Sequence, residues 1–527
     1  MDITCHALDN WKACRSVLAI AIQSYLAACA DLRLACFQIQ RPYKSRREVE
    51  PVLLAIDTEL AGLVSEEEEL GKSRVSLSVL RNTSSALTPV HSLPPELLAP
   101  IFLMAQCQSD GLASNHSFAR VSTYWRSTAT SLPTLWTHII LTPAPTNYEY
   151  ATLSLDRSDG LPLHLDISSK EDSLKWDKQS KRQWKVFLSN VIKKVHTLNI
   201  VDSCIFQAFL DDVIRLFLRH SSPGVLKTLC IKRTGCEDHA DLGSFPDNQS
   251  DPILRSISVL HLSDVLLSWT SAAYHNLIDL RLQFTEDDNK GIFTSELAGI
   301  LAASPRLTTL KLDYITITSS NDWDAEDVVR LAHLEVLCLW FLSYDSWVAL
   351  VSVLSLSDCL GSLEVGILPQ NSVACFSKIS RLVQNFLHGV HVKTLAIIGF
   401  GDDDTQCALS LSATIPSLER LILSDCDLLE PRGDEIAGYQ PDINADTPFR
   451  LAHLYLASSK FSLDHLKQIV LVSGVETLHL DRVPTRYGYN GPPKDELRAA
   501  LLDAFPRLAC VITDEDTTLN WPCRTFN

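Results

Sequence analysis

The sequence lacks the features that mark nucleic-acid-binding proteins and disulfide-stabilised secreted proteins. Basic residues are too few, since 46 Lys and Arg stand against 63 Asp and Glu, and the net charge of −17 repels phosphate backbones and anionic membranes. The 15 cysteines form no C-x-x-C pair and no zinc-finger spacing. We therefore expect reduced thiols in a cytoplasmic and/or nuclear protein that has no nucleic-acid or membrane partner.

Catalytic signatures are missing as well. No G-x-S-x-G, P-loop or paired Cys/His motif occurs in the sequence. Gly399-Phe400-Gly401 lacks the third glycine of a dinucleotide fingerprint, and His388 and His391 lack the i, i+4 spacing of a zinc protease. We predict a protein that is not an enzyme, with no catalytic residue, metal site or cofactor. A nucleophile and base that meet only in space would escape this test.

A long uninterrupted apolar run is also absent. The most apolar stretch, Val17 to Phe37, is broken by Gln23, Asp31 and Arg33. These polar residues are spaced too evenly for a bilayer crossing or the core of a signal peptide. We interpret the stretch as part of an amphipathic helix.

Apolar residues at heptad spacing predict two helices within residues 1–82. Pro42 separates the two series, and Glu67 and Arg74 interrupt the second one. The short connection favours an antiparallel hairpin whose helices cover each other. The alternative is self-association through residues 10–80, because an uncovered apolar seam attracts a partner. The seam positions are Leu18, Ile22, Tyr25, Cys29, Leu32, Cys36 and Ile39, then Leu53, Ile56, Leu60, Leu63, Leu70 and Leu77.

A pattern of the form L-x-x-L-x-L dominates residues 191–527. Its copies recur at intervals of 20 to 33 residues, about 28 on average, which is the period of a leucine-rich repeat. A degenerate further copy begins at Leu508. Residues 141–190 are expected to be a connector with the first strand or strands. The copies begin at Val195, Leu226, Ile257, Leu277, Leu307, Leu334, Leu360, Val392, Leu418, Leu451 and Val475.

Each repeat is predicted to be a strand followed by a helix, because no single unit can bury its own leucines and neighbouring units must cover one another. The expected fold is an α/β solenoid, and a flat parallel α/β sheet is the main rival. The interval between Ile257 and Leu277 leaves too little room for a helix. Residues 236–252, 429–448 and 483–493 are predicted surface insertions, and an enzyme with a site hidden in them is the remote alternative.

In each strand the x positions should point to the concave face while the leucines point inward. These positions carry side chains of both charge signs, including Asp279 and Glu364. Each of them could instead be an ordinary solvated strand residue. The predicted substrate-binding residues are Arg281, Lys311, Lys393, Arg420, Tyr455 and His479.

Residues 91–140 form a compact helical segment between the heptads and the repeats. A first helix is predicted from Pro94, with Leu97, Leu98, Ile101 and Phe102 on one face, and a second from about Ser117 to Thr130. Pro100 is expected to kink or shorten the first helix. The simplest interpretation is a small three-helix bundle whose apolar residues serve its own core.

The motif of this segment resembles the F-box. Its elements are L-P-x-E-[LI]-L, then [IL]-F, V-x-x-x-W-R and L-P-x-L-W, over some 45 residues. With the repeats behind it, the chain is similar to F-box proteins that carry leucine-rich repeats, and the helical hairpin ahead of it resembles fungal members. Pro100 and Ser122, where the family often has cysteine, depart from the pattern. The matching residues are Leu93, Pro94, Glu96, Leu97, Leu98, Ile101, Phe102, Val121, Trp125, Arg126, Leu132, Pro133, Leu135 and Trp136.

The resemblance implies a substrate-recognition adaptor of a Skp1–cullin–F-box (SCF) ubiquitin ligase. The segment would dock onto a Skp1-like adaptor and through it onto a cullin, while the repeats bind an unknown protein substrate. A leucine-rich-repeat scaffold without ubiquitin ligase association is the alternative. The implied Skp1-binding residues are Leu93, Pro94, Leu97, Leu98, Ile101, Phe102, Val121 and Trp136.

Overall fold

The computed structural model divides into two compact units, which are described separately. One comprises Met1–Leu97 with Ser122–Tyr124, and the other Leu98–Val121 with Trp125–Asn527. The structure describes residues 2–527 except 39–45, 84–89, 91–92, 109–113, 142–145, 170–177, 203–206, 235–239, 242–250, 286–290, 321–327, 358, 360, 370–372, 400–403, 426, 429–450, 482–493, 514–516, 519–520 and 523–527.

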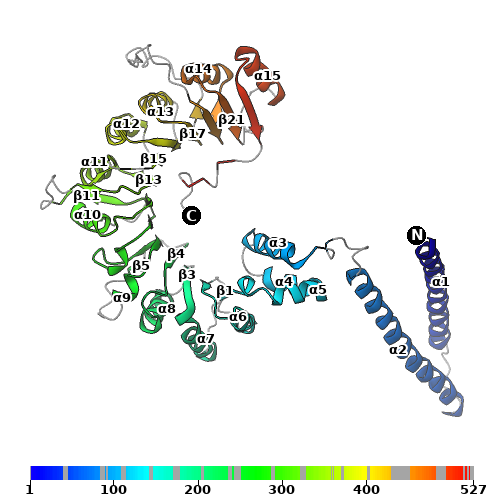
Figure 1. Cartoon of the computed structure of the whole chain (residues 1–527). Coiled ribbons are helices and arrows are strands. Elements are labelled where there is room, and N and C mark those ends of the chain that lie inside the picture. Colours follow the sequence, from blue (N-terminus) through cyan, green and yellow to red (C-terminus); the bar gives the residue numbers. More distant parts are fainter. Residues whose placement is uncertain are drawn as a thin grey trace. The chain divides into compact units, whose positions relative to one another are not determined.

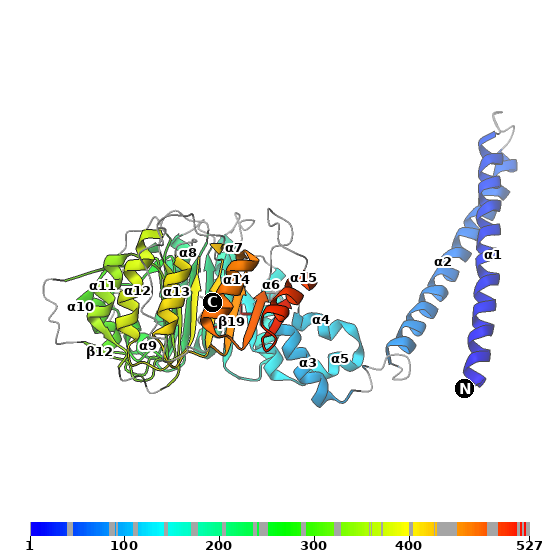
Figure 2. The same cartoon turned by 90° about the horizontal axis from the view of Figure 1, so that it is seen from above.

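The first unit is dominated by two long helices, α1 (Asp2–Gln38) and α2 (Arg46–Thr83), whose axes lie at an angle to each other (Figure 2). They are antiparallel, because the start of α1 and the end of α2 line one shallow groove, where Trp11 and Leu18 face Leu70 and Leu77. Further along the pair, Tyr25 of α1 lies near Glu59 of α2.

The two helices cover each other only partly. Seam residues Leu18, Ile22, Leu60 and Leu70 keep 42% to 55% of their surface exposed. Within α1, the stretch His6–Ala35 is long and apolar enough to cross a membrane by length and composition, with a mean hydropathy of 1.5. The expectation that the hairpin satisfies its own apolar seam therefore holds only in part.

Four short helical elements follow in residues 91–140, whose motif resembles the F-box. This part of the chain is called the F-box-like segment. They are α3 (Pro95–Gln108), α4 (Ser114–Val121), α5 (Thr123–Thr130) and the 3₁₀ helix η2 (Pro133–Trp136). The helix predicted from Ser117 to Thr130 is thus two helices, with the break at Ser122. Pro100 does not end α3, which continues eight residues beyond it and loses one backbone donor.

The second unit is built on one parallel sheet of 14 strands, called the repeat sheet. The strands lie in sequence order, each beside the one before it, whereas a doubly wound sheet reverses its order at a switch point. This order is compatible with a repeat solenoid. The strands are β1 (His138–Leu141), β2 (Leu163–Ser169), β3 (Val195–Asp202), β4 (Thr228–Arg233), β6 (Val259–Ser263), β8 (Asp279–Gln283), β10 (Thr309–Asp313), β13 (Val336–Leu342), β15 (Leu363–Pro369), β16 (Val392–Ile398), β17 (Arg420–Ser424), β19 (His453–Ala457), β21 (Thr477–Asp481) and β22 (Ala509–Thr513).

The repeat sheet is curved (Figure 1). Helices line its outer, convex side, and its inner side is concave. Between Ile257 and Leu277, where no room for a helix was expected, a single 3₁₀ turn η5 (Ala272–Tyr274) follows β6. The helices are α6 (Thr146–Arg157), α7 (Lys178–Val191) with the 3₁₀ turn η4 (Ile192–Lys194), α8 (Gln207–His220), α9 (Asp251–Leu254), α10 (Thr294–Ala302), α11 (Tyr344–Val353), α12 (Val373–Leu387), α13 (Asp404–Ala413), α14 (Leu463–Ser473) and α15 (Lys494–Ala504).

Short second strands follow several repeats and pair in parallel with one another. These are β5 (Ala240–Asp241) with β7 (Val265–Leu266), β9 (Gly291–Phe293) with β11 (Thr316–Thr318), β12 (Val329–Arg330) with β14 (Leu354–Ser355), and β18 (Asp427–Leu428) with β20 (Lys460–Phe461). Most residues of the three predicted insertions lie outside the described residues.

The leucines of the repeats form one continuous core between the sheet and the helices. Leu280 and Leu282 of β8, for example, are buried in it, as are the matching residues of the other strands. Because successive strand residues point to opposite faces, the residue between each such pair lies on the inner, concave face. This alternation sets the positions of the candidate site.

Candidate functional site

The F-box-like segment presents two different faces of α3. Leu98 and Phe102, one turn apart, are fully buried, whereas Leu97, Ile101 and Met104 are 52%, 39% and 61% exposed. The exposed three are spaced i, i+4, i+7 and so form one apolar stripe. The prediction that Leu97, Leu98, Ile101 and Phe102 share one face is therefore wrong, because adjacent helical residues are about 100° apart.

Aromatic rings hold the buried face of α3 in place. The ring of Phe102 stacks on Phe118 of α4 at a centroid distance of 4.7 Å and is tilted against Trp125 of α5 at 5.0 Å. Pairs of this kind stabilise a fold beyond their area burial. The side chain of Phe102 therefore supports the segment from inside.

The remaining predicted docking residues differ widely in exposure. Trp136 is fully buried, its indole Nε1–H donates to the carbonyl of Ala129 at 2.7 Å, and the guanidinium of Arg157 lies over its ring. Val121 and Pro94 are exposed. Leu93 is half-buried, and its carbonyl accepts a hydrogen bond of 2.7 Å from the Tyr124 hydroxyl.

The concave face of the repeat sheet carries one continuous row of side chains in register, called the central row. In parallel strands such neighbours are about 5 Å apart. The first half of the row is polar or charged, and the second half is small and then aromatic. The row runs through Asp166, Asn199, Cys230, His261, Arg281, Lys311, Cys338, Gly366, Ala396, Ile422, Tyr455 and His479.

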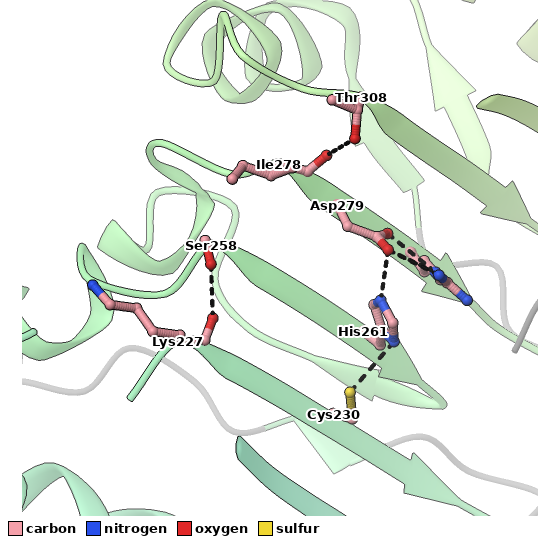
Figure 3. A network of polar contacts seen from close by, with 8 residues as sticks. Lys227, Cys230, Ser258, His261, Ile278, Asp279 and Thr308 are labelled. Atoms are coloured by element: carbon pink, nitrogen blue, oxygen red, sulfur yellow. Dashed lines mark hydrogen bonds and ion pairs between the residues drawn. The ribbon is translucent and has the colours of Figure 1, made fainter. Parts of the chain in front are cut away.

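A network of polar side chains occupies the first half of this face (Figure 3). Cys230 Sγ lies 3.3 Å from Nδ1 of His261, whose Nε2 lies 3.2 Å from Asp279 Oδ2. Arg281 holds the same carboxylate with two nitrogens, at 2.8 and 3.0 Å. Further along the row, Asn199 donates to Asp166 at 2.7 Å.

The order thiol, imidazole, carboxylate is that of a cysteine-based triad, but its electrostatics oppose catalysis. Burial raises the pKa of the Cys230 thiol to about 12, only partly offset by Arg281. An activated nucleophile needs the opposite shift. Burial also raises the pKa of Asp279, but His261 and Arg281 more than compensate and leave it below its ordinary value.

The structure separates the predicted substrate residues into two groups. Arg281 and Lys311 are neighbours in the polar half, and Lys311 is only 1% exposed. Arg420, Tyr455 and His479 gather at the other end, on β17, β19 and β21. Lys393 lies apart from both groups at the start of β16, where its Nζ is 3.6 Å from a carboxylate oxygen of Glu419.

The second half of the face forms what we call the aromatic site, made of Ala396, Arg420, Ile422, Tyr455 and His479. The rings of Tyr455 and His479 stack at a centroid distance of 4.1 Å, and Ala396, Ile422 and Tyr455 make a small apolar cluster separate from the main core.

Two residues beyond the last strand, Trp521 and Pro522, lie at this site. Trp521 packs on the apolar cluster, and the Arg420 guanidinium lies 5.1 Å from the centre of its ring. Pro522 offers its carbonyl to the Cys338 thiol at 3.5 Å. Asp481 of β21 holds Thr517, four residues before Trp521, by accepting from its backbone N–H and its hydroxyl at 3.0 and 2.6 Å.

Sequence reasoning missed several of these residues. Cys230 and His261 occupy the same position of L-x-x-L-x-L as Arg281, so an alignment of the copies would have placed them in the central row. Trp521 lies outside the repeats, and no periodic signal marks it.

These features define a class: an α/β repeat protein with a helix-covered outer face and a concave face that presents polar and aromatic side chains. No protein-family model matches the sequence, and no curated protein matches it. Among the solved structures that match is a chain in the crystal structure of the yeast Rad7 and Elc1 complex. The match has 13% sequence identity, covers 86% of this chain and 97% of that chain, and has a TM-score of 0.35. So distant a likeness carries no argument, and the class rests on the strands described above.

Proposed function

We propose that the chain is a substrate-recognition adaptor of a Skp1–cullin–F-box ubiquitin ligase. The segment from Leu93 to Trp136 binds a Skp1-like adaptor, and the concave face binds a protein substrate. The observation that carries the proposal is the exposed apolar stripe Leu97, Ile101 and Met104, which lies within the F-box-like motif. Apolar side chains of this kind, desolvated together in a partner's pockets, make the hot spots of an interface.

The proposed role is non-catalytic and needs no cofactor. The adaptor would hold a substrate near a charged ubiquitin-conjugating enzyme, so the rate gain comes from effective concentration. The proposal places the chain in the cytoplasm and/or nucleus, with neither nucleic acid nor membrane as partner. It treats α1 as one half of a hairpin, since Trp11 and Leu18 line a groove together with residues of α2.

Co-purification with a recombinant Skp1-like adaptor tests the proposal. The double variant Ile101→Lys/Met104→Lys should weaken the complex by about 30-fold or more, because two hot-spot side chains are replaced by charge. Val186→Lys on α7 is the matched control, since Val186 is equally exposed and lies outside the motif. A second pair, Leu93→Ala/Pro94→Ala, should also lose the complex and keep its circular dichroism spectrum. Failure of the wild-type chain to bind the adaptor overturns the proposal.

The exposed seam of α1 and α2 favours a second candidate function: a leucine-rich-repeat scaffold that self-associates through residues 10–80 and has no ubiquitin ligase association. The same co-purification separates the two, because the scaffold would elute as an oligomer without the adaptor.

A further inference from the structure

We propose that the aromatic site binds a tryptophan-bearing segment of a partner protein, and that Trp521 of the same chain occupies the site until the partner displaces it. The proposal rests on one part of the proposed function, the binding of a protein by the concave face. It does not depend on adaptor docking.

The location of the site indicates a ligand surface. The side chains of Ala396, Ile422 and Tyr455 lie on the face opposite the leucine core, where the described part of the sheet has no helix over it. Tyr455 is nonetheless only 8% exposed, and the apolar residue packed against its cluster is Trp521. An apolar cluster on the concave face that is covered by one side chain, Trp521, is a surface that a side chain of another protein can cover in the same way.

The geometry selects an indole ring. The Arg420 guanidinium lies over the ring of Trp521, an arrangement in which tryptophan is the preferred aromatic partner. The ring of Tyr455 meets the ring of Trp521 edge-on at a centroid distance of 5.0 Å. The ring of His479 stacks on that of Tyr455 at 4.1 Å. An aliphatic side chain would keep the apolar contact and lose both the cation and the edge-on interaction.

The backbone of the residue after the tryptophan also contacts the site. The Cys338 thiol donates to the carbonyl of Pro522, and burial raises the pKa of that thiol, so it stays protonated as a donor at neutral pH. Central-row neighbours Gly366 and Ala396 have little or no side chain, so no bulky side chain stands between Cys338 and Ile422 in the row. The ligand class is therefore a peptide segment with tryptophan followed by a backbone acceptor.

Thr517 and Trp521 are held at two separate places. Thr517 is fixed to the buried carboxylate of Asp481, whereas Trp521 is half-buried and Pro522 is exposed. The ring can leave the site while the attachment at Asp481 remains. A tethered ligand of this kind competes at an effective concentration of about 1 mM, so only a partner that binds well displaces it.

Fluorescence anisotropy with a labelled synthetic peptide of residues 514–527, carrying Cys523→Ser to prevent oxidation, tests the proposal. The full-length Trp521→Ala chain should bind this peptide about tenfold more tightly than the wild-type chain, because the tethered competitor is gone. Adding Arg420→Gln or Tyr455→Ala to that chain should weaken binding by about fivefold or more. Phe293→Ala, an exposed aromatic on β9, is the matched control that changes nothing.

Two peptide variants make the outcome decisive. Peptides with Trp521→Ala or Trp521→Leu should bind at least tenfold more weakly. The proposal is overturned if the Trp521→Ala chain, shown to be folded by an unchanged urea midpoint of its main transition, does not bind the wild-type peptide. Equal binding of the leucine peptide, or equal affinity of the wild-type and Trp521→Ala chains, overturns it too. Co-purification with the adaptor, done on the same preparations, gives a result that does not depend on peptide binding. Failure of the proposed function and failure of this inference are therefore distinguishable.

Discussion

The indole ring of Trp521 stands edge-on to the phenol ring of Tyr455, with their centroids 5.0 Å apart. The two residues belong to different parts of the chain: one lies in a strand of the repeats and the other beyond the last strand. Their contact places Trp521 on the concave face that the repeats would use to bind a protein.

Asp481 should control how firmly Thr517, and with it the attachment of Trp521, is held. Its buried carboxylate accepts from Thr513 and twice from Thr517, so Asp481→Ala leaves those donors without a partner. We expect a loss of about 2–4 kcal/mol in the free energy of unfolding by urea, and faster hydrogen exchange at Thr517. Asp481→Asn keeps an acceptor and should lose less. Equal exchange in all three chains would contradict the assignment.

Asp313 should make stability depend on pH. Burial raises its pKa to about 7, partly offset by a hydrogen bond of 2.8 Å from Gln283. The pKa of this carboxyl in the unfolded chain is about 4. The contribution of Asp313 to the free energy of unfolding is therefore complete below about pH 4 and is lost as the pH rises to about 7.

Urea denaturation from pH 4 to 8 measures this loss, expected to be on the order of 3 kcal/mol. Asp313→Asn, whose amide oxygen can still accept from Gln283, should show a smaller decline and be the more stable chain at pH 8. Parallel curves for the two chains would show that Asp313 does not titrate in this window.

Truncation of two residues on α3 should change the stability of the segment by very different amounts. Phe102→Ala removes the ring that packs against Phe118 and Trp125 and should destabilise the segment by about 3–5 kcal/mol. Met104→Ala removes an exposed side chain and should change stability by less than about 0.5 kcal/mol. Hydrogen exchange across α3 to α5 separates the two outcomes, and a stable Phe102→Ala segment would refute the buried role of that ring.

The Cys230 thiol should be unreactive despite its histidine neighbour. With its pKa raised to about 12, its thiolate fraction at pH 8 is about a thousandfold below that of a free cysteine. Iodoacetamide labelling followed by peptide mapping should modify exposed Cys14 long before Cys230. Rapid labelling of Cys230 that slows in the His261→Ala chain would instead indicate an activated nucleophile.

The exposed apolar seam of α1 and α2 predicts that two copies of the chain associate through their hairpins. The chain should then elute as a dimer in light-scattering chromatography, and Leu18→Lys/Leu70→Lys should weaken dimerisation by roughly 100-fold or more, since each apolar side chain contributes about 1.5–3 kcal/mol. Val64→Lys, exposed and off the seam, is the control. A wild-type chain that stays monomeric at high concentration rules the association out.

The repeat strands could be predicted because their signal is local: each L-x-x-L-x-L copy becomes a strand of the sheet, and β22 follows the degenerate copy at Leu508. Strand alternation also placed Arg281, Arg420, Tyr455 and His479 on the concave face. Periodicity says nothing about what else lies there, so the burial of Lys311 and the position of Trp521 came only from the structure. On α3, counting apolar residues could not separate the face of Phe102 from that of Ile101.

A stack of repeats is a nearly one-dimensional object, in which each unit touches its neighbours and the ends can fray independently. The bond from the Cys338 thiol to the Pro522 carbonyl joins positions 184 residues apart. Together with the contact of Trp521 on Tyr455, this bond ties residues beyond the last strand to β13 and β19. Unfolding from the last strand must break these contacts as well as those with the neighbouring repeat, so they oppose fraying at that end.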